Sequence, residues 1–219
     1  APEAAVSISS VIQGAKSVEN GNILGSNIAN ILLILGVSAV ISDLYVQKNT
    51  VLYEIPFLGF ISLLLMFMGW RYGMISRGGA VILCLLFLAF MFYLYIISKK
   101  QKPENPPVES MSKIKMICFV IFGIAALVIG AKMTVDSATD IARALHVSER
   151  VIGLTVIAFG TSLPELVTCI AAALKKHSDI VIGNIIGSNL FNVLFVLGIT
   201  GLIQPTPFEP AFLMDAALG

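Results

Sequence analysis

The chain has 219 residues, of which 57% are hydrophobic and only 12% are charged. Soluble domains carry about 25% charged residues, so this composition excludes an ordinary soluble protein and predicts an all-α, polytopic membrane protein. The net charge of +1 comes without a basic patch or a finger-like spacing, which argues against nucleic-acid binding. The three cysteines lie singly in apolar segments, so they predict packing residues and no disulfide framework.

Apolar segments long enough to cross a bilayer recur along the chain, since a spanning helix needs about 20 apolar residues. We expect about six spanning helices, with a partial helix at each end. Residues 1–15 are too short and too polar to span alone, and the residues after Pro207 resemble the start of a further helix. We therefore expect the chain to be truncated at both ends. The predicted spans are residues 18–42, 51–71, 78–98, 114–135, 148–175 and 178–203.

Residues 99–113 form a polar linker that is short and rich in proline and lysine. It separates a first half, residues 1–98, from a second half, residues 114–219. The positive-inside rule predicts that this lysine-rich linker is cytoplasmic. Its small size favours a bacterial or archaeal inner membrane; the lipid bilayer is the expected partner, and the oligomeric state is left open. Further lysines expected on the same side are Lys48, Lys175 and Lys176.

Two other segments have a predicted place relative to the membrane. Residues 136–148 are mildly amphipathic and are predicted to lie at the outer interface, after the fourth span ends. The end of the third span carries an aromatic run that is interpreted as lipid-facing or as an interfacial belt. Its members are Phe87, Phe90, Phe92, Tyr93 and Tyr95.

The sequence repeats itself at a distance of 162 residues. Without a gap, Pro2-Glu3 aligns with Pro164-Glu165, and GNILGSNIANILLILG (21–36) aligns with GNIIGSNLFNVLFVLG (183–198). Chance does not plausibly produce two such copies at the same distance from a Pro-Glu pair. An odd number of predicted helix steps separates the copies, so they cross the membrane in opposite directions. Inverted repeats of this kind usually place substrate and ion sites at the midplane, on interrupted helices.

The same alignment predicts what would complete the two halves. The first-half counterpart of residues 119–163 would precede Ala1, so we expect a stretch resembling Gly160-Thr161-Ser162 there. About two further helices are expected after Gly219.

Oxygen-bearing side chains cluster in the middle of the last two predicted spans. Polar groups at bilayer depth are costly unless they meet one another or a cation, so the clusters predict a hard-cation site. Pro164 lies within the first cluster, where it removes a backbone donor and frees nearby carbonyl groups. The clusters are Thr161, Ser162 and Glu165 on one span, and Asn184, Ser188 and Asn192, spaced four residues apart, on the next.

The same segments also show features of close helix packing. Gly183 and Gly187, four residues apart, form a small-residue motif that is common where membrane helices touch. Asn27 and Asn189 lie slightly off the polar stripe. They are interpreted either as interhelical hydrogen-bonding residues or as members of the site.

The motifs GTSLPE (160–165) and GNIIGSNLFN (183–192) resemble the second α-repeat of the calcium/cation antiporters, and more specifically that of the prokaryotic sodium/calcium exchangers. Residues 2–36 resemble the first α-repeat without its opening residues. The resemblance covers most of the chain. It implies a fold of ten helices, an ion site between the second, third, seventh and eighth of them, and transported Ca²⁺ and Na⁺, with K⁺ as a possible third ion and no cofactor.

The resemblance also implies the ion ligands. Glu3 and Glu165 match the paired acidic ligands, and serine, threonine and asparagine side chains match the polar ones. Several family members carry an aspartate at one of the last positions, where this chain has Asn30 and Asn192. With the backbone carbonyl freed near Ala158, the implied ligands are Glu3, Ser26, Asn30, Ala158, Thr161, Ser162, Glu165, Ser188 and Asn192.

The ligand chemistry favours an exchanger. Two glutamates neutralise one divalent ion, and Ca²⁺ takes six to eight oxygen ligands. Na⁺ carries half the charge and would use a regrouped set of the same oxygens, so the two ions would compete. The sequence has neither a nucleotide-binding Gly-rich loop nor a nucleophile elbow, so we predict gradient-driven transport and no enzymatic activity.

Three alternatives stay open at this stage. The first is a proton/calcium or other divalent cation exchanger, and the second is a cation channel lined by the polar stripes. The third is a membrane scaffold without transport activity, or an inactive fragment. For the two glutamates alone, the alternative to an ion site is that they are protonated and hydrogen-bonded within the bundle.

Overall fold

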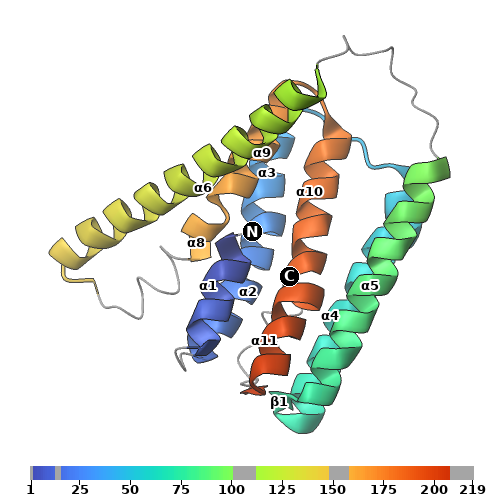
Figure 1. Cartoon of the computed structure of the whole chain (residues 1–219), viewed down its shortest axis with the longest axis vertical. Helices are drawn as coiled ribbons and strands as arrows, with labels where there is room; N and C mark the ends of the chain where they lie inside the picture. Colours follow the sequence, from blue (N-terminus) through green and yellow to red (C-terminus); the bar gives the residue numbers. More distant parts are fainter. Residues whose placement is uncertain (1, 13–15, 101–111, 148–157, 208–219) are drawn as a thin grey trace.

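A computed structural model describes residues 2–12, 16–100, 112–147 and 158–207 of the chain. These residues are almost entirely helical, which confirms the predicted all-α class (Figure 1). The elements are α1 (Pro2–Ile12), α2 (Lys16–Ile28), η1 (Ala29–Ile34), α3 (Leu35–Ile41), η2 (Thr50–Glu54), α4 (Ile55–Tyr72), β1 (Met74–Ile75), α5 (Arg77–Lys100), α6 (Lys113–Ala144), α8 (Ala158–Thr161), α9 (Leu163–Leu174), α10 (Ser178–Leu190), η4 (Phe191–Val196), α11 (Leu197–Ile203) and β2 (Thr206–Pro207), where η marks a π-helical segment.

Two long central helices carry the sequence repeat. One runs through α2, η1 and α3, and the other through α10, η4 and α11. Both widen into a π-helix at the same place, Ala29–Ile34 in the first and Phe191–Val196 in the second. The boundaries of α2, η1 and α3 are therefore repeated in α10, η4 and α11 at the spacing of the sequence repeat. Because π-helical turns are rare and concentrate at functional sites, their duplication indicates that both copies keep a special geometry.

The two central helices run in opposite directions, as the repeat predicted (Figure 1). At one end, the Ser178 hydroxyl at the start of α10 donates a hydrogen bond of 3.1 Å to the Asp43 carbonyl, just after α3. At the other end, β2 follows α11, pairs with β1 and contacts α2. The start of each helix thus lies beside the end of the other.

The apolar core holds α4 and α5 against these central helices. One cluster of buried side chains includes Ile23, Leu65, Leu83 and Leu194, and so joins α2, α4, α5 and η4. Gly198 and Gly201 let α11 approach α5 closely. A Cβ at Gly198 would lie 2.8 Å from the Cys84 sulfur, and one at Gly201 would lie 2.9 Å from the Ala80 Cβ.

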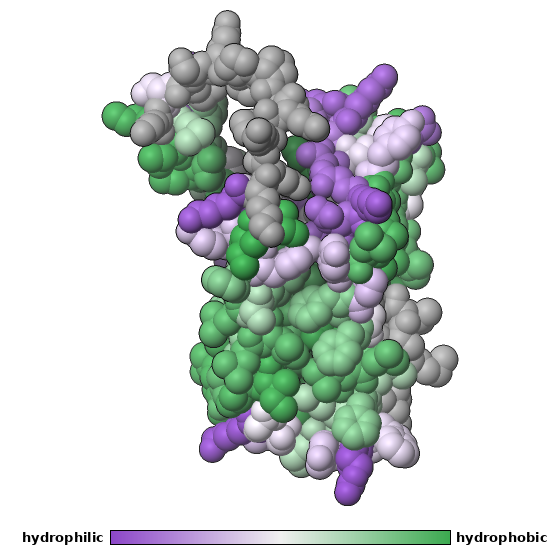
Figure 2. Space-filling model, turned by 90° about the vertical axis from the view of Figure 1, so that its right-hand side faces the viewer, coloured by the Kyte–Doolittle hydropathy of each residue, from purple (hydrophilic) through white to green (hydrophobic). Residues whose placement is uncertain are grey.

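Among the described residues, four helices are long and apolar enough to cross a membrane. Figure 2 shows apolar side chains over the middle of the face formed by α4 and α5, with hydrophilic side chains at both ends. The four spans agree with the predicted segments 18–42, 51–71, 78–98 and 178–203, and they are Asn22–Ile41, Thr50–Tyr72, Arg77–Lys99 and Ser178–Ile203.

The other two predicted spans look different in the structure. Helix α6 does not end near residue 135 but continues through Ala144, because the stretch from Asp136 to Ala144 contains no glycine or proline. The predicted interfacial segment is thus largely part of one 32-residue helix, which leans away from the bundle (Figure 1). Of the span 148–175, residues 148–157 lie outside the described residues, and the remainder is broken between α8 and α9.

The prediction for the aromatic run was wrong for two of its five members, Phe87 and Phe90. Phe92 and Tyr95 are exposed, as predicted, but Phe90 is buried and stacks on Phe57 with ring centroids 5.7 Å apart. Phe87 packs against Phe195, at 5.1 Å. The helical period distributes the run over two faces, so only one face is free for lipid.

The end of α5, the loop between α3 and η2 and the turn between α9 and α10 lie at the same end of the molecule, and β1 lies at the other (Figure 1). The predicted cytoplasmic lysines therefore belong to segments at one end. Residues 101–111 of the linker lie outside the described residues, and the division into halves at this linker stays a prediction.

Candidate ion-binding site

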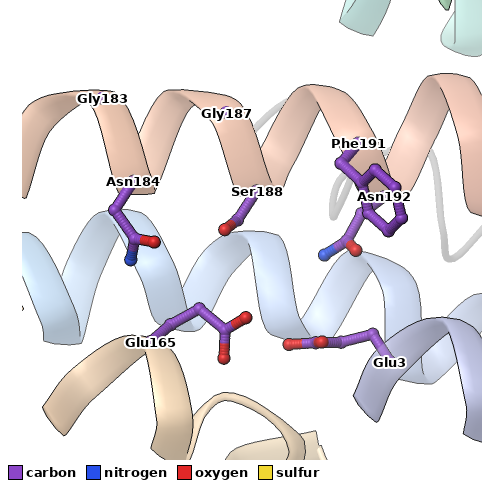
Figure 3. Close-up of a pocket in the computed structure, with 8 residues that line it drawn as sticks. All are labelled: Glu3, Glu165, Gly183, Asn184, Gly187, Ser188, Phe191 and Asn192. Atoms are coloured by element: carbon purple, nitrogen blue, oxygen red, sulfur yellow. The ribbon is translucent and has the colours of Figure 1, made fainter. Parts of the chain in front are cut away.

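A cavity of about 360 Å³ opens between α1, α9 and the α10–η4 helix (Figure 3). Polar side chains from all three elements line it, together with two glycines and one aromatic ring. The lining residues are Glu3, Glu165, Gly183, Asn184, Gly187, Ser188, Phe191 and Asn192.

Two glutamates face each other across this cavity (Figure 3). Glu3 lies in the first turn of α1 and Glu165 in the first turn of α9, and each follows a proline. Proline is favoured in a first helical turn, and the positive end of the helix dipole favours a carboxylate there. Glu3 is only 2% exposed, so its burial is costly unless a positive charge or a proton compensates it.

The predicted polar stripe forms the opposite wall. Asn184, Ser188 and Asn192 all line the cavity, and Figure 3 shows their side chains directed toward the glutamates, with Ser188 above the gap between the two carboxylates. The i, i+4, i+8 spacing was therefore sufficient to predict this face. Asn184 and the glycines are lining residues that were not among the implied ligands.

Helix α9 begins after the predicted interruption. Helix α8 ends at Thr161 and α9 begins at Leu163, so Ser162 separates them. The buried Ser162 donates its backbone amide to the Phe159 carbonyl at 3.1 Å and accepts at its own carbonyl from the Leu166 amide at 3.0 Å. Ala158 is the first residue of α8, and its side chain lies outside the described set.

Thr161 and Ser26 lie in a buried hydrogen-bonded cluster beside the cavity. Their hydroxyls are 3.3 Å apart, and the Thr161 hydroxyl donates to Asn22 Oδ1 at 3.1 Å. Asn22 in turn donates through Nδ2 to the Ser7 hydroxyl at 3.1 Å. The structure thus brings these two implied ligands to each other, although neither lines the cavity wall.

The second repeat contains a matching contact. Asn184 donates through Nδ2 to the Cys169 sulfur at 3.2 Å, and Asn184 and Cys169 are the repeat counterparts of Asn22 and Ser7. The sequence interpretation did not identify Ser7 and Cys169, because the two copies of the repeat have different residue types at this position. Each lies four residues after a site glutamate, which is the spacing that would have identified both.

The remaining implied ligands, Asn30 and Asn192, meet a second pair of asparagines between the central helices. Asn30 Nδ2 donates to Asn189 Oδ1 at 2.9 Å, and Asn192 Nδ2 donates to Asn27 Oδ1 at 3.1 Å. Asn30 is fully buried in this cluster and does not line the cavity, whereas Asn192 belongs to both. The interpretation of Asn27 and Asn189 as interhelical hydrogen-bonding residues is confirmed.

Comparison with known proteins agrees with this architecture. The family model described as "Sodium/calcium exchanger protein" matches residues 1–96 and 115–218. The inner membrane protein YrbG of Escherichia coli is 36% identical over 221 residues, which cover 95% of this chain and 67% of that protein. The sodium/calcium exchanger MaX1 of Methanosarcina acetivorans is 31% identical over 245 residues, covering 93% of this chain and 70% of that protein.

A solved structure of the sodium-calcium exchanger NCX_Mj, soaked with 2.5 mM Na⁺ and 10 mM Sr²⁺, aligns with a TM-score of 0.83 at 33% identity. The alignment covers 99% of this chain and 71% of that one, so the fold is shared over nearly the whole chain. The matched family model, the relatives and the shared fold lead to one conclusion: the chain is a prokaryotic-type, multi-pass integral membrane protein that belongs to the sodium/calcium exchanger family.

Proposed function

We propose that this protein is a secondary antiporter that exchanges Na⁺ for Ca²⁺ across the membrane by alternating access. Membership of the sodium/calcium exchanger family supports cation antiport that involves calcium. The observation that carries the finer proposal is the pair formed by Glu3 and Glu165, which come from oppositely oriented repeats and face each other across one polar cavity.

The cavity has the charge and the oxygen atoms that Ca²⁺ requires. The two carboxylates balance a divalent ion, and Ser188, Asn184 and Asn192 supply further oxygens on the opposite wall. Ca²⁺ prefers six to eight oxygen ligands and accepts water among them. Since a water molecule takes up about 30 Å³, a cavity of about 360 Å³ holds the ion together with several waters.

Sodium would use an overlapping set of ligands. A monovalent ion needs less negative charge and suits hydroxyl and carbonyl oxygens, which are concentrated beside the cavity. Glu3 and Glu165 border both groups, so occupation by Na⁺ would weaken the binding of Ca²⁺. The ligands that we assign to these neighbouring positions are Ser26, Asn30, Thr161, Ser162 and the carbonyl of Ala158.

The arrangement of the repeats suits alternating access. The short helix α9 holds one glutamate and α1 holds the other, and both pack against the central helices. The hydrogen bonds that Thr161 makes with the side chains of Asn22 and Ser26 join α8 to α2. A movement of one repeat against the other would break these bonds on one side of the site and expose it there.

The proposal is tested by calcium uptake into vesicles that contain the purified protein. We expect uptake to follow an imposed outward Na⁺ gradient and to stop when the gradient is collapsed. Uptake that ignores the Na⁺ gradient and follows a pH gradient would instead identify a proton/calcium exchanger. Flux without any counter-ion requirement, at rates above those of carriers, would identify a channel.

The same assay gives a pH dependence at a fixed Na⁺ gradient. Protons and cations compete for Glu3 and Glu165, so exchange should fall as the pH is lowered and should recover when calcium is increased. Stimulation by acid would contradict sodium coupling.

A further inference from the structure

Four buried asparagines form a hydrogen-bonded cluster between the two central helices. Asn27 and Asn30 belong to the first repeat, and their counterparts in the second are Asn189 and Asn192. All four are at most 2% exposed. The cluster lies next to the cavity, because Asn192 is a member of both.

The hydrogen bonds in the cluster are reciprocal between the repeats. Asn30 Nδ2 donates to Asn189 Oδ1 at 2.9 Å, and the equivalent bond with the repeats exchanged runs from Asn192 Nδ2 to Asn27 Oδ1 at 3.1 Å. Asn189 Nδ2 also donates to the Asn27 carbonyl at 3.4 Å, which joins two residues at the repeat distance. In the bonds of 2.9 Å and 3.1 Å, the donor is the asparagine at the proposed ligand position, and the acceptor is an asparagine of the opposite repeat.

This pattern decides which end of two amide groups is available to an ion. An asparagine side chain has an oxygen on one side and an NH₂ group of almost the same size on the other. Only the oxygen binds a cation, and a rotated amide would direct two hydrogen atoms at it. When the Nδ2 group of Asn30 or Asn192 donates to a neighbouring asparagine, the Oδ1 atom of the same side chain is available to bind the ion. Asn30 Oδ1 is buried and has no hydrogen-bond partner among the described residues.

We propose that Asn27 and Asn189 are positioning residues, each of which fixes the amide orientation of the ligand asparagine of the opposite repeat so that it presents oxygen to the transported cation. This inference rests on the proposed function, which places Asn192 and Asn30 among the ion ligands. It also implies that each half of the transporter completes the ligand set of the other.

The test is a double-mutant cycle on calcium affinity, measured by isothermal titration of the purified protein with CaCl₂. Asn27→Leu removes the acceptor for Asn192 and should weaken calcium binding about tenfold, because the loss of a group that orients a ligand typically costs 10–100-fold in metal affinity. In an Asn192→Asp background, Asn27→Leu should cause no loss. A carboxylate presents oxygen in either orientation, and the Asn27 oxygen would repel it.

The opposite outcome would overturn the inference. If Asn27→Leu weakens binding equally in both backgrounds, the two effects are additive and Asn27 does not act through the amide of Asn192. The reciprocal pair, Asn189→Leu with and without Asn30→Asp, repeats the test in the other repeat, with the inhibition of calcium binding by NaCl as the readout because Asn30 is assigned to the Na⁺ positions. It also serves if the first set of variants does not fold.

A control separates positioning from general damage. Ile23→Ala truncates a fully buried apolar side chain on the same helix as Asn27. It should lower the thermal unfolding temperature and leave the calcium Kd unchanged, whereas Asn27→Leu should change the Kd. A shift in Kd with Ile23→Ala as large as that with Asn27→Leu would count against positioning. An unmutated protein that binds no calcium would refute the proposed function itself.

Discussion

At the scale of single residues, the proposed site depends on two carboxylates whose burial is costly unless a cation or a proton compensates it. Glu3 and Glu165 each begin a short helix, and both are directed into the same cavity. The proposed function requires the negative charge of the two glutamates. Glutamine has nearly the same shape as glutamate but carries no charge. A glutamine at either position therefore tests the charge alone.

Glu165→Gln should reduce calcium exchange by about a hundredfold or more, because removing one partner of a buried charge interaction costs about 3–5 kcal/mol. The protein should still fold, since the side-chain volume is kept. Exchange is measured as Na⁺-dependent uptake of radioactive calcium, and folding by thermal unfolding in detergent. Glu54→Gln is the matched control, because Glu54 ends η2 and does not line the site cavity. Retained transport in the Glu165 variant would remove this carboxylate from the mechanism.

The sequence predicted these residues to different extents. Glu3, Glu165 and the stripe from Asn184 to Asn192 followed from spacing and from the repeat, because polar side chains in an apolar span have few reasons to be there. The partners of Asn22 and Asn184 did not follow, since contacts with Ser7 and Cys169 depend on how helices pack. The amide orientation of Asn30 and Asn192 likewise depends on neighbours from the opposite repeat.

At the scale of elements, the repeat predicts helical segments of the same length in both halves, but equivalent residues in these segments have different packing neighbours. Gly36 in α3 and Gly198 in α11 are counterparts in sequence. A Cβ at Gly36 would meet nothing within 4 Å, whereas one at Gly198 would lie 2.8 Å from the Cys84 sulfur. Glycine is therefore required for close helix packing at this position in the second repeat but not in the first.

This difference gives a prediction for stability. Gly198→Ala should destabilise the protein by about 1–3 kcal/mol, because α11 has no room for a methyl group against α5. Gly36→Ala should be neutral or stabilising by up to about 1 kcal/mol, since alanine is the better helix former. Thermal unfolding in detergent measures both, and Gly198→Ala combined with Cys84→Ala should recover part of the loss. Equal effects at the two glycines would contradict the packing described for α5 and α11.

The lengths of helices were less predictable than their existence. Hydropathy located the spans around α4 and α5, but it did not show that α6 continues through Ala144. It also gave no sign of the π-helical turns at Ala29–Ile34 and Phe191–Val196. Such turns add a residue to one helical turn without a distinctive composition, so only packing determines them.

At the scale of the whole molecule, two oppositely oriented copies of the repeat line one cavity. Glu3 comes from the first repeat, whereas Glu165 and the wall from Asn184 to Asn192 come from the second. The asparagine cluster joins the two repeats beside this cavity. Because the proposed ligands come from both repeats, a relative movement of the halves would change access to the ion without the assembly of a second site.

The most direct test of this account is crystallographic. Crystals of the protein soaked with Sr²⁺, which substitutes for Ca²⁺ and scatters anomalously, should show a peak between Glu3 and Glu165 on the side of Ser188. The peak should disappear when Na⁺ is raised in large excess, because the two ions share ligands. A Sr²⁺ peak outside this cavity, or one between the glutamates that Na⁺ does not displace, would contradict the account.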